Sequence, residues 1–258
     1  MAEPVVIVSK EGAIATVTLN RPEKLNALNR ELRLAFCRAM QTLRDDSETR
    51  LVILTGAGRA FCAGLDLREL GSSGIREEGN VTFITVVEDM EVPVIAAVNG
   101  FAITGGFELA LACDMIIADD NAQFADTHAR VGVMPGGGMS ARLPRAIGIR
   151  KAKELSLTGN YLTATEAERI GLVNRVVPSG QAVAAARDLA AQILSAEQGI
   201  VRQMKRLYDL ASRASLHDAL RIEQDFFRAF NSGARSGNFE QRRESVIERG
   251  RAQADTKH

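Results

Sequence analysis

Apolar residues recur along the chain with two periods, which predict two kinds of element. From Ala13 to Leu19 apolar and polar residues alternate, as in a strand with one buried face. Three runs are continuously apolar, which is typical of strands covered on both faces. These runs are Leu51–Leu54, Val94–Val98 and Met115–Ile117. After Asn29, a good helix-capping residue, apolar residues recur every three or four positions up to Leu43. Strands that alternate with helices favour an α/β fold with right-handed crossovers.

The pattern changes near Gln181, after which the apolar spacing is helical. Helical patterns cover Ala184–Leu194, Ile200–Ala211 and Leu216–Phe230. The sequence therefore predicts an α/β core over residues 1–180, which carries the site, and a helical region over residues 181–258. We assign the helical region to oligomerisation, because Phe226, Phe227 and Phe230 give it apolar surface to bury. We also assign it to closing the functional site of the core.

Two local patterns refine this division. The polar, glycine-rich stretch over residues 71–80 predicts a mobile loop. The segment Thr163–Glu166 has the pattern of a capping box, which predicts a short helix that ends near Gly171.

Composition narrows the possible partners and compartment. The chain has 258 residues, with 32 basic and 32 acidic side chains, so it has no overall field to attract nucleic acid or an anionic membrane. Its three cysteines cannot all pair, which favours a reducing compartment. The first residues lack a basic and apolar leader, and no run approaches the ~18 apolar residues of a membrane span. We therefore expect a cytoplasmic protein.

Two loops carry the candidate chemistry. The strand Val94–Val98 leads through an Asn-Gly turn to Gly105 and Gly106, which open an apolar helix with Glu108 in its first turn. A second loop, Arg59–Leu67, follows the strand Leu51–Leu54. Two uncovered N–H groups that converge on one oxygen make an oxyanion hole, and a nearby carboxylate supplies proton transfer. The alternative is that the glycines only permit tight packing and that Glu108 only complements the helix dipole.

These loops and their spacing resemble those of the enoyl-CoA hydratase/isomerase superfamily, the crotonases. Further matching segments are Asn20–Leu28, Asp114–Ala118, Met134–Gly138 and Gly171–Pro178. The resemblance extends over about residues 5–180, and it implies a spiral of ββα turns and an enzyme that acts on an acyl-CoA.

The resemblance also implies roles for single residues. The backbone N–H groups of Ala63 and Gly105 would form the oxyanion hole, and Glu108 would activate water. Contacts with coenzyme A or the acyl group would come from Lys24, Ala27, Ala63, Asp66, Leu67, Gly106 and Pro135. No metal or separate cofactor is implied, because coenzyme A is part of the substrate and motifs for metals, nucleotide phosphates and NAD are absent from the sequence. The family further implies a homotrimer or a dimer of trimers.

His128 departs from the family pattern. It stands where the family's hydratases carry a second glutamate. An imidazole exchanges protons near neutral pH, so it can replace that acid. Alternatively, His128 is a structural residue bonded to Asp126 or to a backbone carbonyl, and Asp126 and Arg130 are polar alternatives for the role.

The sequence thus points first to hydration of a 2-enoyl-CoA. Two alternatives stay open: another crotonase reaction on a CoA thioester, such as isomerisation, dehydration or hydrolysis, and a catalytically weak acyl-CoA-binding protein that has lost an acid at His128.

Overall fold

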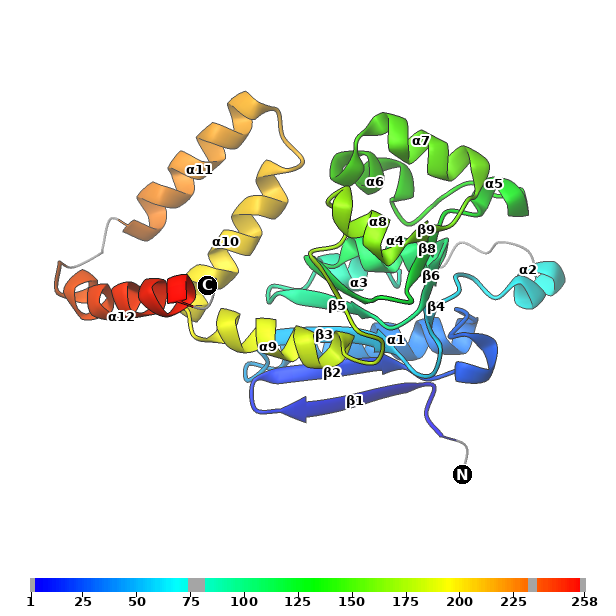
Figure 1. Cartoon of the computed structure of the whole chain (residues 1–258), viewed down its shortest axis with the longest axis horizontal. Coiled ribbons are helices and arrows are strands. Elements are labelled where there is room, and N and C mark those ends of the chain that lie inside the picture. The colour runs from blue at the N-terminus through cyan, green and yellow to red at the C-terminus, as the bar shows by residue number, and fades with distance from the viewer. Residues whose placement is uncertain (1–2, 74–81, 232–235, 256–258) are drawn as a thin grey trace. The chain divides into compact units, whose positions relative to one another are not determined.

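The computed structural model describes residues 3–73, 82–231 and 236–255 of the chain (Figure 1). The chain divides into two compact units, Met1–Arg202 and Gln203–His258, and each is described by itself. The first unit holds all of the described strands. These are β1 (Val6–Glu11), β2 (Ile14–Leu19), β3 (Leu51–Gly56), β4 (Ala60–Cys62), β5 (Val94–Val98), β6 (Phe101–Ile103), β7 (Met115–Asp119), β8 (Gln123–Ala125), β9 (Leu162–Thr163) and β10 (Arg175–Val177).

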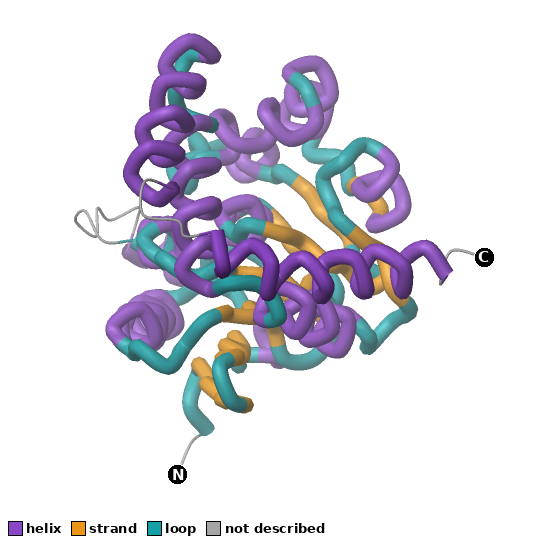
Figure 2. Tube along the Cα trace, turned by 90° about the vertical axis from the view of Figure 1, so that its left-hand side faces the viewer, coloured by secondary structure: helices purple, strands orange, loops and turns teal. Residues whose placement is uncertain are grey.

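Helices cover the central strands of the first unit, whereas β1 near the N-terminus is exposed (Figure 2). They are the 3-10 turn η1 (Pro22–Lys24) and the helices α1 (Arg30–Asp45), α2 (Leu67–Ser73), α3 (Thr85–Glu88), α4 (Gly105–Ala112), α5 (His128–Val131), α6 (Met139–Ile147), α7 (Ile149–Thr158), α8 (Ala164–Arg169) and α9 (Ala182–Leu194). Helix α10 (Gln198–Ala211) crosses the boundary, and the second unit continues with α11 (Leu216–Asn231) and α12 (Ser236–Asp255).

The strands form two sheets, which the chain builds in repeated turns. One sheet has the order β1-β2-β3-β5-β7-β10 and the other has the order β4-β6-β8-β9. Strands β3, β5 and β7 enter the first sheet in parallel, and each is followed at once by β4, β6 or β8 in the second sheet. Helix α4 then returns the chain from β6 to β7, and after β8 the chain passes through α5, α6, α7 and β9 before α8 leads back to β10. The predicted α/β class with a spiral of ββα turns is confirmed.

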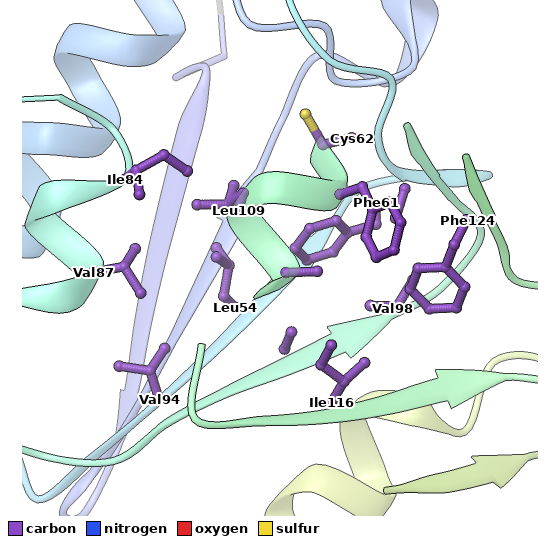
Figure 3. Close-up of a cluster of buried hydrophobic side chains, with 14 of the residues drawn as sticks. Leu54, Phe61, Cys62, Ile84, Val87, Val94, Val98, Leu109, Ile116 and Phe124 are labelled. Atoms are coloured by element: carbon purple, nitrogen blue, oxygen red, sulfur yellow. The ribbon is translucent and has the colours of Figure 1, made fainter. Parts of the chain in front are cut away.

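Both faces of the central strands β3, β5 and β7 of the six-stranded sheet are covered, as their continuous apolar runs predict. In β3, Val52 and Leu54 join the cluster that holds α1 and α4, while Leu51 and Ile53 face α9. Figure 3 shows part of the first cluster, with Leu109 of α4 near Leu54. Because α4 is packed into this core, its first turn is held in a fixed place.

Helix α9 belongs to the first unit, so the division falls later than residue 180. Its small side chains Ala182, Ala186 and Ala190 are buried against β3, β5 and β7. Asp119 at the end of β7 accepts hydrogen bonds from the backbone N–H groups of Gly180, Gln181 and Ala182. The helical pattern that begins near Gln181 therefore starts with a helix of the core, and the second unit begins at Gln203.

The two helix starts predicted from capping residues are confirmed. Asn29 Oδ1 accepts the N–H of Leu32 at 3.0 Å at the start of α1. Thr163 and Glu166 form the capping box of α8, which ends at Arg169, just before Gly171 with its φ of +80°. Of the expected mobile loop, residues 71–73 lie in α2 and residues 74–81 lie outside the described part.

None of the described helices is long and apolar enough to cross a membrane.

Candidate active site

The first loop of the site follows β4 and is held by the turn after η1. The N–H of Ala63 donates to the carbonyl of Leu25 at 3.0 Å, and the N–H of Leu28 donates to the carbonyl of Gly64 at 2.8 Å. The structure thus contradicts the expectation for Ala63, because an N–H group already bonded to a carbonyl cannot serve a substrate oxygen. Ala63 holds the loop in place.

The neighbouring Leu65 offers the free donor instead. Leu65 forms a parallel bridge with Leu28 in which Gly64 and Asp66 make the hydrogen bonds. The N–H of Leu65 therefore points away from Leu28, and no backbone carbonyl among the described residues accepts it. The signal that sequence reasoning missed is Gly64, whose φ of +88° turns the chain between the two candidate donors.

The second donor lies at the start of α4, close to the first loop. Gly105 is the first residue of α4, and within the described residues its N–H meets no carbonyl. A β-carbon on Gly105 would lie 3.6 Å from the nitrogen of Leu65, and one on Gly64 would lie 3.2 Å from the nitrogen of Gly105. Two uncovered N–H groups thus lie side by side at a helix N-terminus, the arrangement that an oxyanion requires.

Close contacts and a strained residue fix the start of α4. A β-carbon on Gly106 would lie 2.0 Å from the carbonyl oxygen of Cys62, so Gly106 serves close packing between α4 and β4. Thr104 has φ +51° and ψ −109°, an unfavourable conformation for a residue with a β-carbon. Its hydroxyl accepts the N–H of Thr127 at 3.2 Å and lies 2.5 Å from the Thr127 hydroxyl. These bonds tie the start of α4 to the start of α5.

Glu108 is buried in the first turn of α4 and is held by one oxygen. Its Oε1 accepts the N–H groups of Gly137 at 2.8 Å and Met139 at 3.2 Å. Burial raises the pKa of the carboxyl, although the hydrogen bond from Met139 and the nearby His128 oppose the change. With Oε1 occupied, the other oxygen, Oε2, remains for chemistry.

His128 begins α5 and lies beside Glu108, as its position in the family pattern predicts. The distance from His128 Nε2 to Glu108 Oε2 is 3.9 Å. Its Nδ1 lies 2.6 Å from Asp126 Oδ1, which also accepts the His128 backbone N–H at 3.2 Å. The exposed fractions of Glu108, Asp126 and His128 are 3%, 1% and 7%. Of the two alternatives for His128, the bond to Asp126 is thus present, and the ring faces Glu108 as well.

The structure does not place Arg130 in this group. Arg130 is exposed, and its Nε donates to the carbonyl of Thr158 at 2.7 Å. Its guanidinium group therefore supports the end of α7.

The expected coenzyme A contacts gather on two neighbouring loops. Lys24 ends η1 and is exposed, and its carbonyl accepts the N–H of Ala27 at 3.0 Å. Burial acts to raise the pKa of Asp66, but the pairing with Arg21 at 3.3 Å and hydrogen bonds from backbone N–H groups together outweigh it and lower the pKa of the carboxyl. Leu67 begins α2 and is exposed. Asp66 therefore fastens the two loops together.

Pro135 lies elsewhere, in the loop between α5 and α6 that also supplies Gly137 to Glu108. Arg142 holds this loop, since its guanidinium group pairs with Glu88 and donates to the carbonyl of Gly137 at 2.6 Å. Within the described ranges no cluster of three or more His, Cys, Asp or Glu side chains has the arrangement of a metal site.

Comparison with known proteins identifies the family. A model of the enoyl-CoA hydratase/isomerase family matches residues 9–251, so the chain belongs to this family. The chain is 40% identical over 260 residues to a probable enoyl-CoA hydratase 1, peroxisomal, of Arabidopsis thaliana, covering 100% of this chain and 98% of that protein. It is also 40% identical over 233 residues to a crotonyl-CoA hydratase of Syntrophomonas wolfei, covering 88% of this chain and 90% of that protein.

A solved structure agrees with these relatives. The crystal structure of enoyl-CoA hydratase from Bacillus anthracis has a TM-score of 0.85 to this chain at 34% identity. The match covers 94% of this chain and 96% of that chain.

Proposed function

We propose that this protein is an enoyl-CoA hydratase, which adds water across the double bond of a 2-enoyl-CoA. The observation that carries the proposal is the free oxygen of Glu108, buried and facing His128, next to the paired N–H groups of Leu65 and Gly105. Together these groups can stabilise an oxyanion, activate a water molecule and transfer a proton, which are the three steps that hydration of an enoyl thioester requires. The relatives named as hydratases support it.

Each group has a role in the reaction. The thioester oxygen accepts hydrogen bonds from the N–H groups of Leu65 and Gly105. Each of these donors stabilises the transition state by about 3 kcal/mol as negative charge develops on that oxygen. Glu108 Oε2 accepts a proton from water while the water oxygen bonds to the β-carbon. The electron pair of the double bond moves toward the thioester oxygen, and the α-carbon then takes a proton from the second acid–base group, His128. The substrate gains one proton and one hydroxide, which together make one water.

Assay of the purified protein with saturated and 2-unsaturated acyl-CoA thioesters tests this function. We expect the absorbance of the conjugated thioester to fall and a 3-hydroxyacyl-CoA to appear. A product with a moved double bond, release of free coenzyme A, or binding without turnover would instead favour the alternatives left open by His128.

We further propose that coenzyme A binds along the loops that hold Lys24, Ala27, Asp66 and Leu67, with Pro135 on the acyl side and no separate cofactor. The exposed Lys24 gives a cation for phosphate groups. Lys24→Ala should raise the KM for acyl-CoA and leave kcat unchanged, because the phosphates lie away from the reacting atoms. A change in kcat alone would contradict this placement.

We also propose that the protein is a homotrimer or a dimer of trimers. The described helices α10 and α11 bury no residue within the chain, and Tyr208, Leu216 and Phe227 have exposed fractions of 70%, 79% and 65%. Apolar surface of this extent favours contact with further copies. Light scattering at micromolar concentration should return a multiple of three chains, and a monomer mass would contradict it.

A cytoplasmic location completes the proposal. It is supported by the odd number of cysteines in the chain, Cys37, Cys62 and Cys113, which cannot all pair in disulfides. Fractionation of cells that express a tagged chain tests it.

A further inference from the structure

Asp126 and His128 form a buried pair at one turn of the chain, between β8 and α5. The side-chain contact of 2.6 Å and the backbone hydrogen bond of 3.2 Å both use Asp126 Oδ1. The imidazole ring is thus held at its Nδ1 side and at its own backbone. Its Nε2 is the atom directed at Glu108.

The contact decides which ring nitrogen carries the proton. A carboxylate only accepts hydrogen bonds, so Nδ1 must be the donor. Burial acts to raise the pKa of Asp126, but the hydrogen bonds from His128 and from the hydroxyl of Ser156 outweigh it, and the pKa lies below its ordinary value. Asp126 therefore stays a carboxylate at neutral pH. A neutral His128 ring then has a bare Nε2, and a charged ring has an Nε2 proton that points toward Glu108.

We propose that Asp126 is a positioning residue that holds His128 with Nδ1 protonated and Nε2 facing Glu108, so that an imidazole–carboxylate couple does the work of paired carboxylates. The inference rests on the proposed hydration. Asp126 does not touch the reacting atoms and acts through the ring.

The couple balances the protons of one turnover. Glu108 Oε2 takes a proton from water as the oxygen bonds to the β-carbon, and the charged His128 ring gives its Nε2 proton to the α-carbon. Glu108 is then protonated and the ring is neutral. The proton returns from Oε2 to Nε2 across their separation of 3.9 Å through one water, which restores both groups.

Two carboxylates lie beside the ring, one at each of its nitrogen atoms. Among the described residues, the titratable groups in contact with the ring are Asp126 on its own turn and Glu108 on α4. Helix α7 packs against α5 and contributes the neutral hydroxyl of Ser156 to Asp126. Proton transfer between the ring and a carboxylate is therefore possible only on the Glu108 side, because Nδ1 is engaged by Asp126.

Asp126→Asn tests the role, with Asp119→Asn as the matched control. Asp119 is also a buried carboxylate, but it caps α9 and lies outside the acid–base group. We expect Asp126→Asn to lower kcat by about tenfold or more. Asp119→Asn should leave kcat unchanged and lower only thermal stability.

A double variant separates positioning from a general effect on folding. If Asp126 acts through the ring, Asp126→Asn should change kcat by less than about twofold in a His128→Gln background. An equal loss in both backgrounds would overturn the inference.

Nitrogen-15 NMR of the histidine rings shows which nitrogen of His128 carries the proton, and it needs no substrate. The protein has 3 histidines, so the spectrum of His128→Gln identifies the His128 signals. At alkaline pH the wild-type ring should carry its proton on Nδ1, and this preference should weaken in Asp126→Asn. A ring protonated on Nε2 in the wild type would overturn the inference. Absence of hydratase turnover in a protein with the expected NMR signals would overturn the proposed function alone.

Discussion

Glu108 shows how the site uses a residue that the fold disfavours. A carboxylate with an exposed fraction of 3% has lost most of its water, and hydrogen bonds from the described part of the chain reach only Oε1. The free oxygen is therefore a stronger base than that of an exposed glutamate. Its position and burial, added to the ability of a carboxylate to accept a proton, make it suitable for activating water.

Glu108→Gln should reduce kcat by about 100- to 10,000-fold, because glutamine keeps the size of the side chain but cannot accept a proton. Steady-state kinetics on a 2-enoyl-CoA measures the change, and calorimetric binding of the saturated acyl-CoA checks that affinity is kept. A fall of less than about fivefold would assign Glu108 a structural role.

The same substitution should stabilise the protein near neutral pH. Burial raises the folded-state pKa of Glu108, so the fold favours the protonated form and wild-type stability rises as pH falls through that pKa. Glutamine does not titrate. Thermal unfolding should therefore show Glu108→Gln more stable than wild type near neutral pH, with the difference shrinking as the pH falls. A difference that grows on acidification would contradict the raised pKa.

His128→Glu, which introduces the acid that hydratases of the family carry, should not restore a family-like site by itself. The new carboxylate would lie against Asp126 and near Glu108, and three carboxylates would repel one another. We expect low activity for His128→Glu and recovery of at least about tenfold when Asp126→Asn is added. Activity assays on both variants decide this, and full activity of the single variant would show that Asp126 does not act on this position.

At the scale of elements, the oxyanion hole is a property of how α4 begins and not of any side chain. Leu65 and Gly105 lie on different turns of the spiral, and the close approach at Gly64 brings their N–H groups together. Gly105 and Gly106 are therefore required to be glycine for different structural reasons. Gly106 packs on Cys62, whereas Gly105 leaves space in front of Leu65.

Gly105→Ala and Gly106→Ala should distinguish an effect on the N–H donors from an effect on packing. The nearest atoms to a new β-carbon at Gly105 lie 3.6 Å away, so the variant should fold normally, but the methyl group lies over the Leu65 N–H. We expect an unchanged melting temperature and a fall in kcat of about 100-fold. Gly106→Ala should fail to fold or lose much stability, because its β-carbon would lie 2.0 Å from the Cys62 oxygen. Normal turnover by a folded Gly105→Ala would exclude this oxyanion hole.

The sequence predicts these elements well and the atoms of the site only in part. The runs at β3, β5 and β7, the cap at Asn29 and the position of Glu108 follow from local patterns. The choice of Leu65 over Ala63 depends on the φ of Gly64 and on a hydrogen bond to Leu25, a residue far away in sequence. The placement of the domain boundary beyond α9 depends on α9 covering one face of the six-stranded sheet. A helical sequence pattern does not reveal which surface the helix packs against.

At the scale of the molecule, α9 completes the core. Without it, Leu51, Ile53, Ile95, Ala97 and Ile117 would form an uncovered apolar face. The stretch from Gln203 onward is a separate compact unit.

Two truncations should therefore behave differently. A chain of residues 1–202 should be soluble and show cooperative unfolding, whereas a chain of residues 1–180 should aggregate because it lacks α9. Size-exclusion chromatography and circular dichroism compare the two. Cooperative unfolding of the shorter chain would place the boundary of the core at residue 180.

The turn over residues 126–128 has a consequence for engineering. His128, the proposed second proton-transfer group, and Asp126, the residue proposed to orient it, stand two positions apart where β8 leads into α5, while Glu108 and the proposed oxyanion donors come from other parts of the chain. Asp126 and His128 can therefore be exchanged together, provided that Thr127 between them is kept, because its bonds to Thr104 hold the start of α4. A small library confined to the codons of Asp126 and His128 would change the proposed second acid–base group and keep the scaffold proposed to bind the thioester, so it could explore new reactions on one framework.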